Sequence, residues 1–164
     1  MNALILVDSQ FGNTARVADE IAAGFGPGAR ILGLPSPGIA PSLAQVDLLI
    51  VGGPTIERGM SARLLALLGD LAPAVGGLPV AVFDTRYRGP GLYVGSAARQ
   101  ALGRLRSAGA RPLVPPKSYH VQRSPGRSGA PQGAADVCLV SGEVERARAW
   151  GRSLREVAGA RRAA

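Results

Sequence analysis

Short apolar runs alternate along this chain with segments of helical period, and that alternation constrains the fold more than any other feature. The runs that have the length and flanking turn residues of buried strands are residues 4–7, 30–34, 47–53 and 79–83, with pieces of a last strand at 112–114 and 119–121. Apolar strands that are separated by helices form a parallel sheet with helices on both faces. The sequence therefore predicts an α/β fold.

Four segments between these runs carry an apolar stripe of helical period. The stripes are Thr14, Val17, Ala18, Ile21, Ala22 and Phe25; Met60, Leu64, Leu67, Leu68 and Leu71; Ala98, Ala101, Leu102 and Leu105; and Val144, Ala147, Gly151, Leu154 and Ala158. Ser141 is expected to cap the last helix, and one further helical turn is expected near Leu43. Residues 123–135 are rich in Gly, Ser and Pro and predict a long exposed loop.

The chain is long enough for one domain, residues 1–164, with a core of its own. Its one cysteine, Cys138, and its one histidine, His120, cannot form a structural zinc site or a disulfide framework. The first apolar run stops at Asp8, so no signal peptide is expected, and later apolar stretches are interrupted before they could span a bilayer. These features predict a cytoplasmic protein with no membrane span.

The net charge of +8 is distributed unevenly along the chain. Residues 1–85 hold four arginines against seven acids, whereas residues 86–164 hold fourteen arginines and Lys117 against four acids. Such a basic half could attract an acidic protein or a nucleic acid, or it could be an ordinary solvated surface. Aromatic residues are only 4% of the chain, which argues against a stacking platform for single-stranded nucleic acid, and no nucleic-acid partner is expected.

The loop after the first predicted strand combines small, hydroxyl and amide residues at the start of a helix. It consists of Ser9, Gln10, Phe11, Gly12, Asn13 and Thr14. Its backbone N–H groups and the helix dipole could hold a phosphate without a cationic side chain. The alternative is an ordinary helix cap by Asn13 or Thr14. The loop has neither the Gly-Lys-Ser/Thr of a nucleotide-triphosphate loop nor the G-x-G-x-x-G of a dinucleotide site.

The same segment, V-D-S-Q-F-G-N-T-x-x-x-A-x-x-I, resembles the flavodoxin signature, in which S/T-x-x-G-x-T binds the phosphate of FMN. Ser9, Gly12 and Thr14 stand where that pattern requires them, whereas Val7 stands where the family usually has an aromatic. The resemblance implies a flavodoxin-like fold. That fold is a three-layer, doubly wound sheet of five parallel strands in the order 2-1-3-4-5.

The loop after the third predicted strand is similar to the family's G-S/G-P-T-x-x-G segment, which lies against the flavin ring. Its cofactor-binding residues would be Pro54, Thr55, Ile56, Glu57, Arg58 and Gly59. A flexible Gly59 would suit a peptide that changes orientation when the flavin gains a proton. Many relatives place an aromatic near Ile56, so this chain lacks a stacking group there.

A third segment, F-D-T-R followed by G-S-A-A, resembles a set of small flavodoxin-family proteins, and a loop is expected after the fourth strand. Its implied cofactor-binding residues are Asp84, Thr85, Arg86, Tyr87 and Gly89. Tyr87 is the first choice to stack on the flavin and Tyr93 the second, although either could simply cover the loop. The closing S-G-E-V-E-R-A-R-A-W-G resembles a packing signature of the family, which places Trp150 in the core.

Arginines near the implied flavin would raise its reduction potential. A unit positive charge roughly 8 Å from the ring, at an effective dielectric constant near 20, contributes about 2 kcal/mol, on the order of 90 mV for one electron. Arg58, Arg86 and Arg88 lie in the flavin-facing segments. We therefore expect a less reducing flavin than in the acidic surroundings typical of the family.

The leading hypothesis is an FMN-binding electron carrier that works between a reductase and an acceptor protein, as a monomer or a weak homodimer. One alternative is a small FMN-dependent oxidoreductase of the quinone or porphyrinogen type. Another is an interaction module that keeps the fold without a flavin. No catalytic residue and no metal site is predicted: Ser9 lacks the G-x-S-x-G context, His120 is expected to be structural or exposed, and Cys138 is expected to be inert.

Overall fold

A computed structural model describes residues 1–34, 41–89, 94–124 and 136–163 of the chain. The strands are β1 (Ala3–Val7), β2 (Ala29–Gly33), β3 (Leu48–Pro54), β4 (Pro79–Tyr87), β5 (Arg111–Pro112), β6 (Lys117–Arg123) and β7 (Val137–Leu139). The helices are α1 (Asn13–Phe25), α2 (Ala62–Leu71), α4 (Ala97–Ser107) and α5 (Glu143–Ala163), with a 3₁₀ turn, η1 (Ala72–Ala74). The predicted helical stripes all lie within or beside these helices.

The strands form one mostly parallel sheet in the order β2-β1-β3-β4-β6-β7. The predicted order 2-1-3-4-5 is confirmed, with the fifth strand divided into β5 and β6, which both pair with β4. β7 was not predicted. It pairs antiparallel with β6 and lies at the edge of the sheet.

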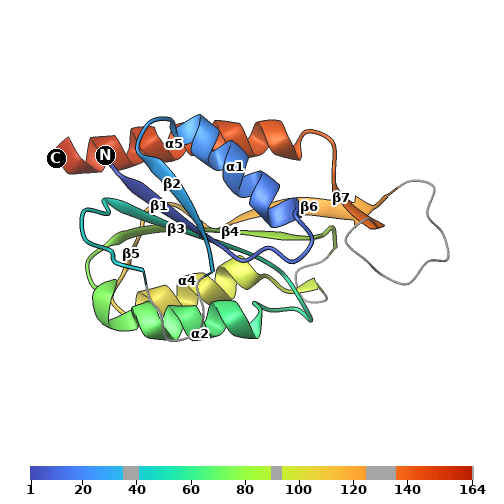
Figure 1. The fold of residues 1–164 in the computed structure, drawn as a ribbon, viewed down its shortest axis with the longest axis horizontal. Helices are drawn as coiled ribbons and strands as arrows, with labels where there is room; N and C mark the ends of the chain where they lie inside the picture. The colour runs from blue at the N-terminus through green and yellow to red at the C-terminus, as the bar shows by residue number, and fades with distance from the viewer. Residues whose placement is uncertain (35–40, 90–93, 125–135, 164) are drawn as a thin grey trace.

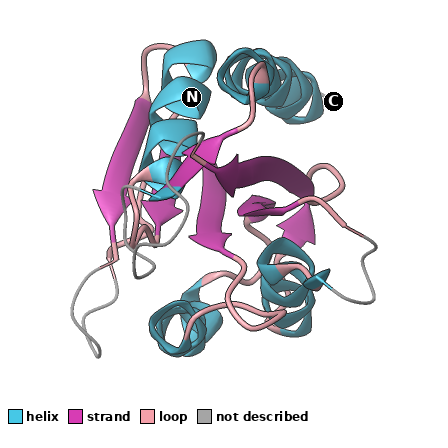
Figure 2. Cartoon of the chain, turned by 90° about the vertical axis from the view of Figure 1, so that its right-hand side faces the viewer, coloured by secondary structure: helices cyan, strands magenta, loops and turns pink. Residues whose placement is uncertain are grey.

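The helices cover the sheet in two layers, as the alternation of strands and helices predicts. α1 and α5 lie on one face and α2 and α4 on the other (Figures 1 and 2). Successive side chains of a strand point to opposite faces. In β1, Ile5 accordingly packs under α1 and α5, whereas Leu4 and Leu6 pack under α2 and α4.

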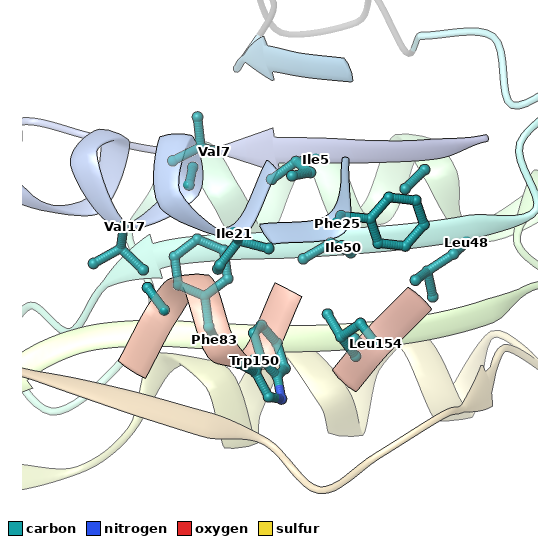
Figure 3. Packing of buried hydrophobic residues seen from close by; sticks show 14 of the residues in the cluster. Ile5, Val7, Val17, Ile21, Phe25, Leu48, Ile50, Phe83, Trp150 and Leu154 are labelled. Carbon is teal, nitrogen blue, oxygen red and sulfur yellow. The ribbon is translucent and has the colours of Figure 1, made fainter. Parts of the chain in front are cut away.

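Three aromatic rings form the centre of the layer under α5. Phe83, Tyr119 and Trp150 pack edge to face, with ring centroids 6.0 to 6.4 Å apart. Figure 3 shows Phe83 and Trp150 beside Ile21 of α1 and Leu154 of α5. Trp150 is therefore a core residue, as predicted.

Two glycines bring α1 and α5 unusually close together. A Cβ on Gly24 would lie 2.0 Å from the carbonyl oxygen of Arg148, and one on Gly151 would lie 2.1 Å from that of Ile21. Both distances are too short for a real Cβ, so only glycine fits. The close approach fixes α1, and with it the loop at its amino end, against the longest helix of the fold.

β4 extends four residues beyond its predicted end at Phe83. The expectation that Asp84 to Tyr87 form a loop is wrong, because β6 pairs with this stretch from Phe83↔Lys117 to Tyr87↔Val121. The polar residues of the stretch remain in the sheet since a neighbouring strand satisfies their backbone groups. Only Arg88 and Gly89 of the predicted loop follow the strand.

Two further expectations need correction. Near Leu43 the chain makes a turn at Ala44 and Gln45 rather than a helical turn. α5 begins at Glu143, and the carbonyl of Gly142, not of Ser141, accepts the first helical hydrogen bond. His120 lies within β6, which contains the predicted strand piece at 119–121. The predicted loop at 123–135 falls mostly outside the described residues, and no described helix is long and apolar enough to cross a membrane.

Candidate functional site

The loop between β1 and α1 presents a row of free backbone donors. Gly12, in a left-handed conformation with φ of 82°, occupies the cap position of the helix without a side-chain cap, so the alternative of an ordinary cap by Asn13 or Thr14 is not the arrangement found. Within the described residues, the N–H groups of residues 10 to 14 donate to no other group of the protein. Free donors at a helix amino end, where the dipole is positive, fit an anion such as a phosphate.

The hydroxyl groups of this loop are held in place by the protein. The Ser9 hydroxyl accepts a hydrogen bond of 3.1 Å from the Ala15 N–H. The hydroxyl of Thr14, whose side chain is buried, lies 2.8 Å from that of Thr85 on β4. A pair of hydroxyls has two protons and uses one in their shared bond, so the second can be donated to a ligand.

On the other face of the sheet, toward α4, the Asp84 carboxylate of β4 accepts several hydrogen bonds. Its buried Oδ2 accepts hydrogen bonds from the Ser96 hydroxyl at 2.6 Å, the Thr55 hydroxyl at 3.1 Å and the Ala98 N–H at 3.1 Å. Ser96 caps α4, so the carboxylate lies at the positive end of that helix. The Oδ1 atom is buried with no hydrogen-bond partner in the described residues.

Side chains alternate along the end of β4, so this one strand serves both faces of the sheet. Asp84 and Arg86 point toward the start of α4. Arg86 donates to the Gly95 carbonyl, just before that helix, at 2.8 Å and to the Ser118 hydroxyl of β6 at 3.1 Å. Thr85 points toward α1, and by the same alternation Tyr87 does too. The predicted set from Asp84 to Tyr87 is therefore divided between two sides.

The segment after β3 forms a tight two-residue turn. The backbone groups of Ile56 and Gly59 exchange hydrogen bonds of 2.8 and 2.9 Å, and between them Glu57 and Arg58 both have positive φ, 47° and 71°. Positive φ is uncommon and strained for residues other than glycine, and such strain clusters at functional sites. The flexibility of Gly59 stays a prediction, and the unusual backbone conformations of this turn lie next to it. The strained residues are its two neighbours.

Bonds between the segments bring most of the predicted site together. The Thr55 N–H donates to the Thr85 carbonyl at 2.9 Å, and the Thr55 hydroxyl accepts from Ala97 N–H at 3.0 Å, which joins the β3 and β4 segments to α4. The Thr14–Thr85 bond adds the first loop. All three segments therefore lie at the carboxyl edge of the sheet.

Several of the other predicted residues at this edge are exposed. Phe11 is 49% and Tyr87 46% exposed, and Gln10, Arg88 and Gly89 are exposed as well. Ile56 is half-buried. Tyr93, the second choice for stacking, lies outside the described residues.

Sequence reasoning missed four residues that support the site. Ser61 caps α2 and donates to the buried Asp8 carboxylate. The Ser96 hydroxyl donates to Asp84, and the Ser118 hydroxyl accepts from Arg86. The fourth is Val137 of β7, whose carbonyl accepts a hydrogen bond of 3.0 Å from the predicted Asn13. A serine directly before a helical stripe was a usable signal for Ser61 and Ser96. Val137 had none, since it is 124 residues from Asn13 in sequence.

No protein-family model and no curated protein matches this chain by sequence. Solved structures do match. Oxidised flavodoxin 1 from Bacillus cereus is 17% identical, with a TM-score of 0.71 over 95% of this chain and 98% of that one. A flavodoxin, WrbA-like protein from Agrobacterium tumefaciens is 18% identical, with a TM-score of 0.70 over 97% and 98% of the two chains.

The same fold also occurs within a larger protein. A flavodiiron core from Synechocystis matches 98% of this chain with 16% identity and a TM-score of 0.70, and the match covers 36% of that chain. At these identities the likeness is one of fold. The chain thus has the flavodoxin-like fold, as the resemblance of its first loop implied. Its candidate site lies at the carboxyl ends of the parallel strands, which is where open α/β sheets bind ligands.

Proposed function

We propose that this protein binds FMN at the carboxyl edge of the sheet and carries electrons between redox partner proteins. The observation that carries the proposal is the row of free N–H groups at residues 10 to 14, beside the Thr14–Thr85 hydroxyl pair and Ser9. This set offers several backbone N–H and hydroxyl donors at the positive end of a helix, which suits the phosphate dianion of a mononucleotide.

The ring of the flavin would lie against the segments that follow β3 and β4. The strained turn from Ile56 to Gly59 would border it on one side, and Tyr87, exposed and on the α1 face, is the side chain available to stack on it. When bound, FMN supplies a ring that accepts and releases one or two electrons. The protein's own part is to hold the phosphate, shield one face of the ring and place fixed charges near it.

Two charged side chains near the expected position of the ring are held in place by the protein. The buried Asp84 carboxylate accepts three hydrogen bonds, and the Arg86 guanidinium donates to the Ser118 hydroxyl and to the Gly95 carbonyl. Because both side chains are fixed, they act on the flavin without reorganising when its charge changes. Arg86 favours a negatively charged reduced flavin, which is why we expect a less reducing potential.

FMN titration tests the proposal. The purified protein should take up FMN at a ratio of one to one, with quenched flavin fluorescence and a visible spectrum that survives dialysis. Replacement of Gly12 by valine should weaken binding at least tenfold, because β-branched residues rarely adopt positive φ. Gly77→Val, which also has positive φ but lies at the other end of the sheet, is the matched control. Retention of full affinity in Gly12→Val would contradict the phosphate site.

Two alternatives are separated by the same preparation. An interaction module without a flavin would bind no FMN, and the half-buried Ile56 in place of an aromatic is the feature that favours it. A self-sufficient oxidoreductase would oxidise NAD(P)H with a quinone and no added reductase. An electron carrier would need the reductase. Sedimentation of the loaded protein tests the proposed monomer or weak homodimer.

A further inference from the structure

The carboxyl edge of the sheet carries exposed arginines from four different elements. Arg16 lies in the first turn of α1, Arg58 in the turn after β3, Arg88 directly after β4, and Arg123 at the end of β6. We call these four residues the arginine rim. Parallel strands end at the same edge, so the rim surrounds the candidate site.

The rim arginines have no partners among the described residues. None of the four makes an ion pair or donates a side-chain hydrogen bond there. Several other arginines are used by the fold itself: Arg86, Arg111, Arg146, Arg148, Arg155 and Arg162 each bond to a carbonyl, hydroxyl or carboxylate. The rim is therefore a surface of free guanidinium groups that the fold does not need.

Acidic residues do not neutralise this surface. In the same segments Asp8 and Asp84 are buried and already accept hydrogen bonds, and Asp136 is half-buried and engaged. The exposed acids among the described residues of these segments are Glu57 and Asp19, which lies three residues after Arg16 on α1, so the four rim arginines face two exposed acids. The edge thus presents a net positive potential toward solvent.

Two exposed rings accompany the rim. Phe11 and Tyr87 are among the most exposed large apolar side chains of the described residues, and both belong to segments of the same edge. Exposed aromatic residues and arginines are enriched in the contact surfaces of proteins. Together they have the composition of a small, transient docking surface rather than of an ordinary solvated face.

We propose that the arginine rim docks an acidic redox protein, with Phe11 and Tyr87 in the contact. This inference rests on the proposed function, because the site that the rim surrounds is the one where the flavin would exchange electrons. Complementary charge would raise the association rate at low salt and lose its effect as salt screens it. The acidic partner is favoured over a nucleic acid because the rim is interrupted by Glu57 and offers only two exposed rings for stacking.

Stopped-flow electron transfer from the reduced, FMN-loaded protein tests the proposal, with an acidic b-type cytochrome and a basic c-type cytochrome as acceptors. The second-order rate constant with the acidic acceptor should fall at least tenfold between about 20 mM and about 500 mM NaCl, and that with the basic acceptor should rise. In Arg58→Glu/Arg88→Glu the two salt dependences should exchange sign. Arg104→Glu/Arg152→Glu changes the net charge equally on exposed faces of α4 and α5 and should behave as the parent.

Three outcomes would overturn the proposal. The first is a rate constant with the acidic cytochrome that does not depend on salt. The second is an equal effect of the rim variant and of the control variant, which would assign steering to net charge alone. The third is displacement of the acidic cytochrome by an equal concentration of duplex DNA at about 150 mM salt, which would assign the rim to nucleic acid.

Failure of flavin binding is distinguishable from failure of docking. Calorimetric binding of the oxidised acidic cytochrome to the flavin-free chain measures docking without electron transfer. It should be weakened at least tenfold by the rim variant and not by the control. If FMN does not bind but this contrast remains, the docking surface stands and the proposed function is wrong.

Discussion

The hydroxyl groups of Thr14 and Thr85, 71 residues apart in sequence, share a hydrogen bond of 2.8 Å. The bond joins the first turn of α1 to the end of β4, so the loop that offers its N–H groups and the strand that carries Asp84 and Tyr87 are one unit. A change in either segment is therefore felt at both ends of the candidate site.

Thr85→Val keeps the side-chain shape but leaves the buried Thr14 hydroxyl without its partner. We expect it to lower the free energy of unfolding by about 1–3 kcal/mol, as unsatisfied buried hydroxyls do. The double variant Thr14→Val/Thr85→Val should cost less than the sum of the two single variants, because the two residues are in contact. Urea denaturation of all four proteins measures the coupling. Additive effects would show that the hydroxyl pair contributes nothing.

Asp84→Ala removes the acceptor shared by Thr55, Ser96 and the Ala98 N–H. Three donors lose a charged partner, so the free energy of unfolding should fall by about 3 kcal/mol. Asp19→Ala, at an exposed position on α1, should stay within about 0.5 kcal/mol of the parent. Equal denaturation midpoints for the two variants would refute the role given to the Asp84 network.

Gly151→Ala places a Cβ 2.1 Å from the Ile21 carbonyl and must push α1 and α5 apart. Such overpacking should cost about 1–3 kcal/mol. Gly159→Ala is the matched control, since it lies on the same helix at an exposed position with nothing within 4 Å of an added Cβ. It should stabilise the protein by up to about 1 kcal/mol, because alanine is the better helix former. Thermal unfolding would show opposite shifts of the melting temperature.

Arg86→Gln should lower the midpoint potential of the bound flavin by tens of millivolts, in line with the estimate of about 90 mV for a charge roughly 8 Å away. Arg86 is half-buried and held by two hydrogen bonds, so its charge is fixed. Arg88→Gln removes an exposed charge, which solvent and salt screen, and should have a smaller effect that vanishes at high salt. Redox titration of both variants at two salt concentrations measures the two shifts. Equal shifts that respond equally to salt would contradict the prediction.

Burial raises the pKa of the Tyr119 phenol far above its usual value of about 10, with a further raising effect from Glu143 and an opposing one from Arg146. The folded state therefore keeps the proton that the unfolded state loses, and stability falls as the pH rises above about 10. Tyr119→Phe should remove this alkaline loss. At neutral pH it should be no less stable than the parent, because the Tyr119 hydroxyl has no hydrogen-bond partner in the described residues. Denaturation midpoints at pH 7 and at alkaline pH test both statements.

The amphipathic periods of α1, α2, α4 and α5 and the apolar runs of β1, β3 and β4 could be predicted because each element buries its own stripe or face. The end of β4 could not. Asp84, Thr85 and Arg86 are polar in sequence, and they remain in the strand because β6 and the end of β3 pair beside them and α1 and α4 bond to the side chains of Thr85 and Asp84. Tertiary partners decided that boundary.

The candidate site likewise has a part that the local sequence predicts and a part that it does not. The first loop could be predicted as an anion site, since small and hydroxyl residues before a helix leave backbone N–H groups free to bind an anion. The partners of those residues, Thr85 for Thr14 and Val137 for Asn13, lie far away in the chain and leave no local signal. Positive φ at Glu57 and Arg58 was equally invisible, because neither residue type favours it.

The alternation of side chains along the end of β4 limits how the length of this chain can vary. Insertion of one residue between Phe83 and Asp84 would turn the carboxylate and the guanidinium toward α1, and the threonine hydroxyl and the tyrosine ring toward α4. A single added residue would thus exchange the surroundings of both halves of the site without changing its composition. Chains that share this site should therefore vary in length after Tyr87 and keep the length of the strand before Asp84 unchanged.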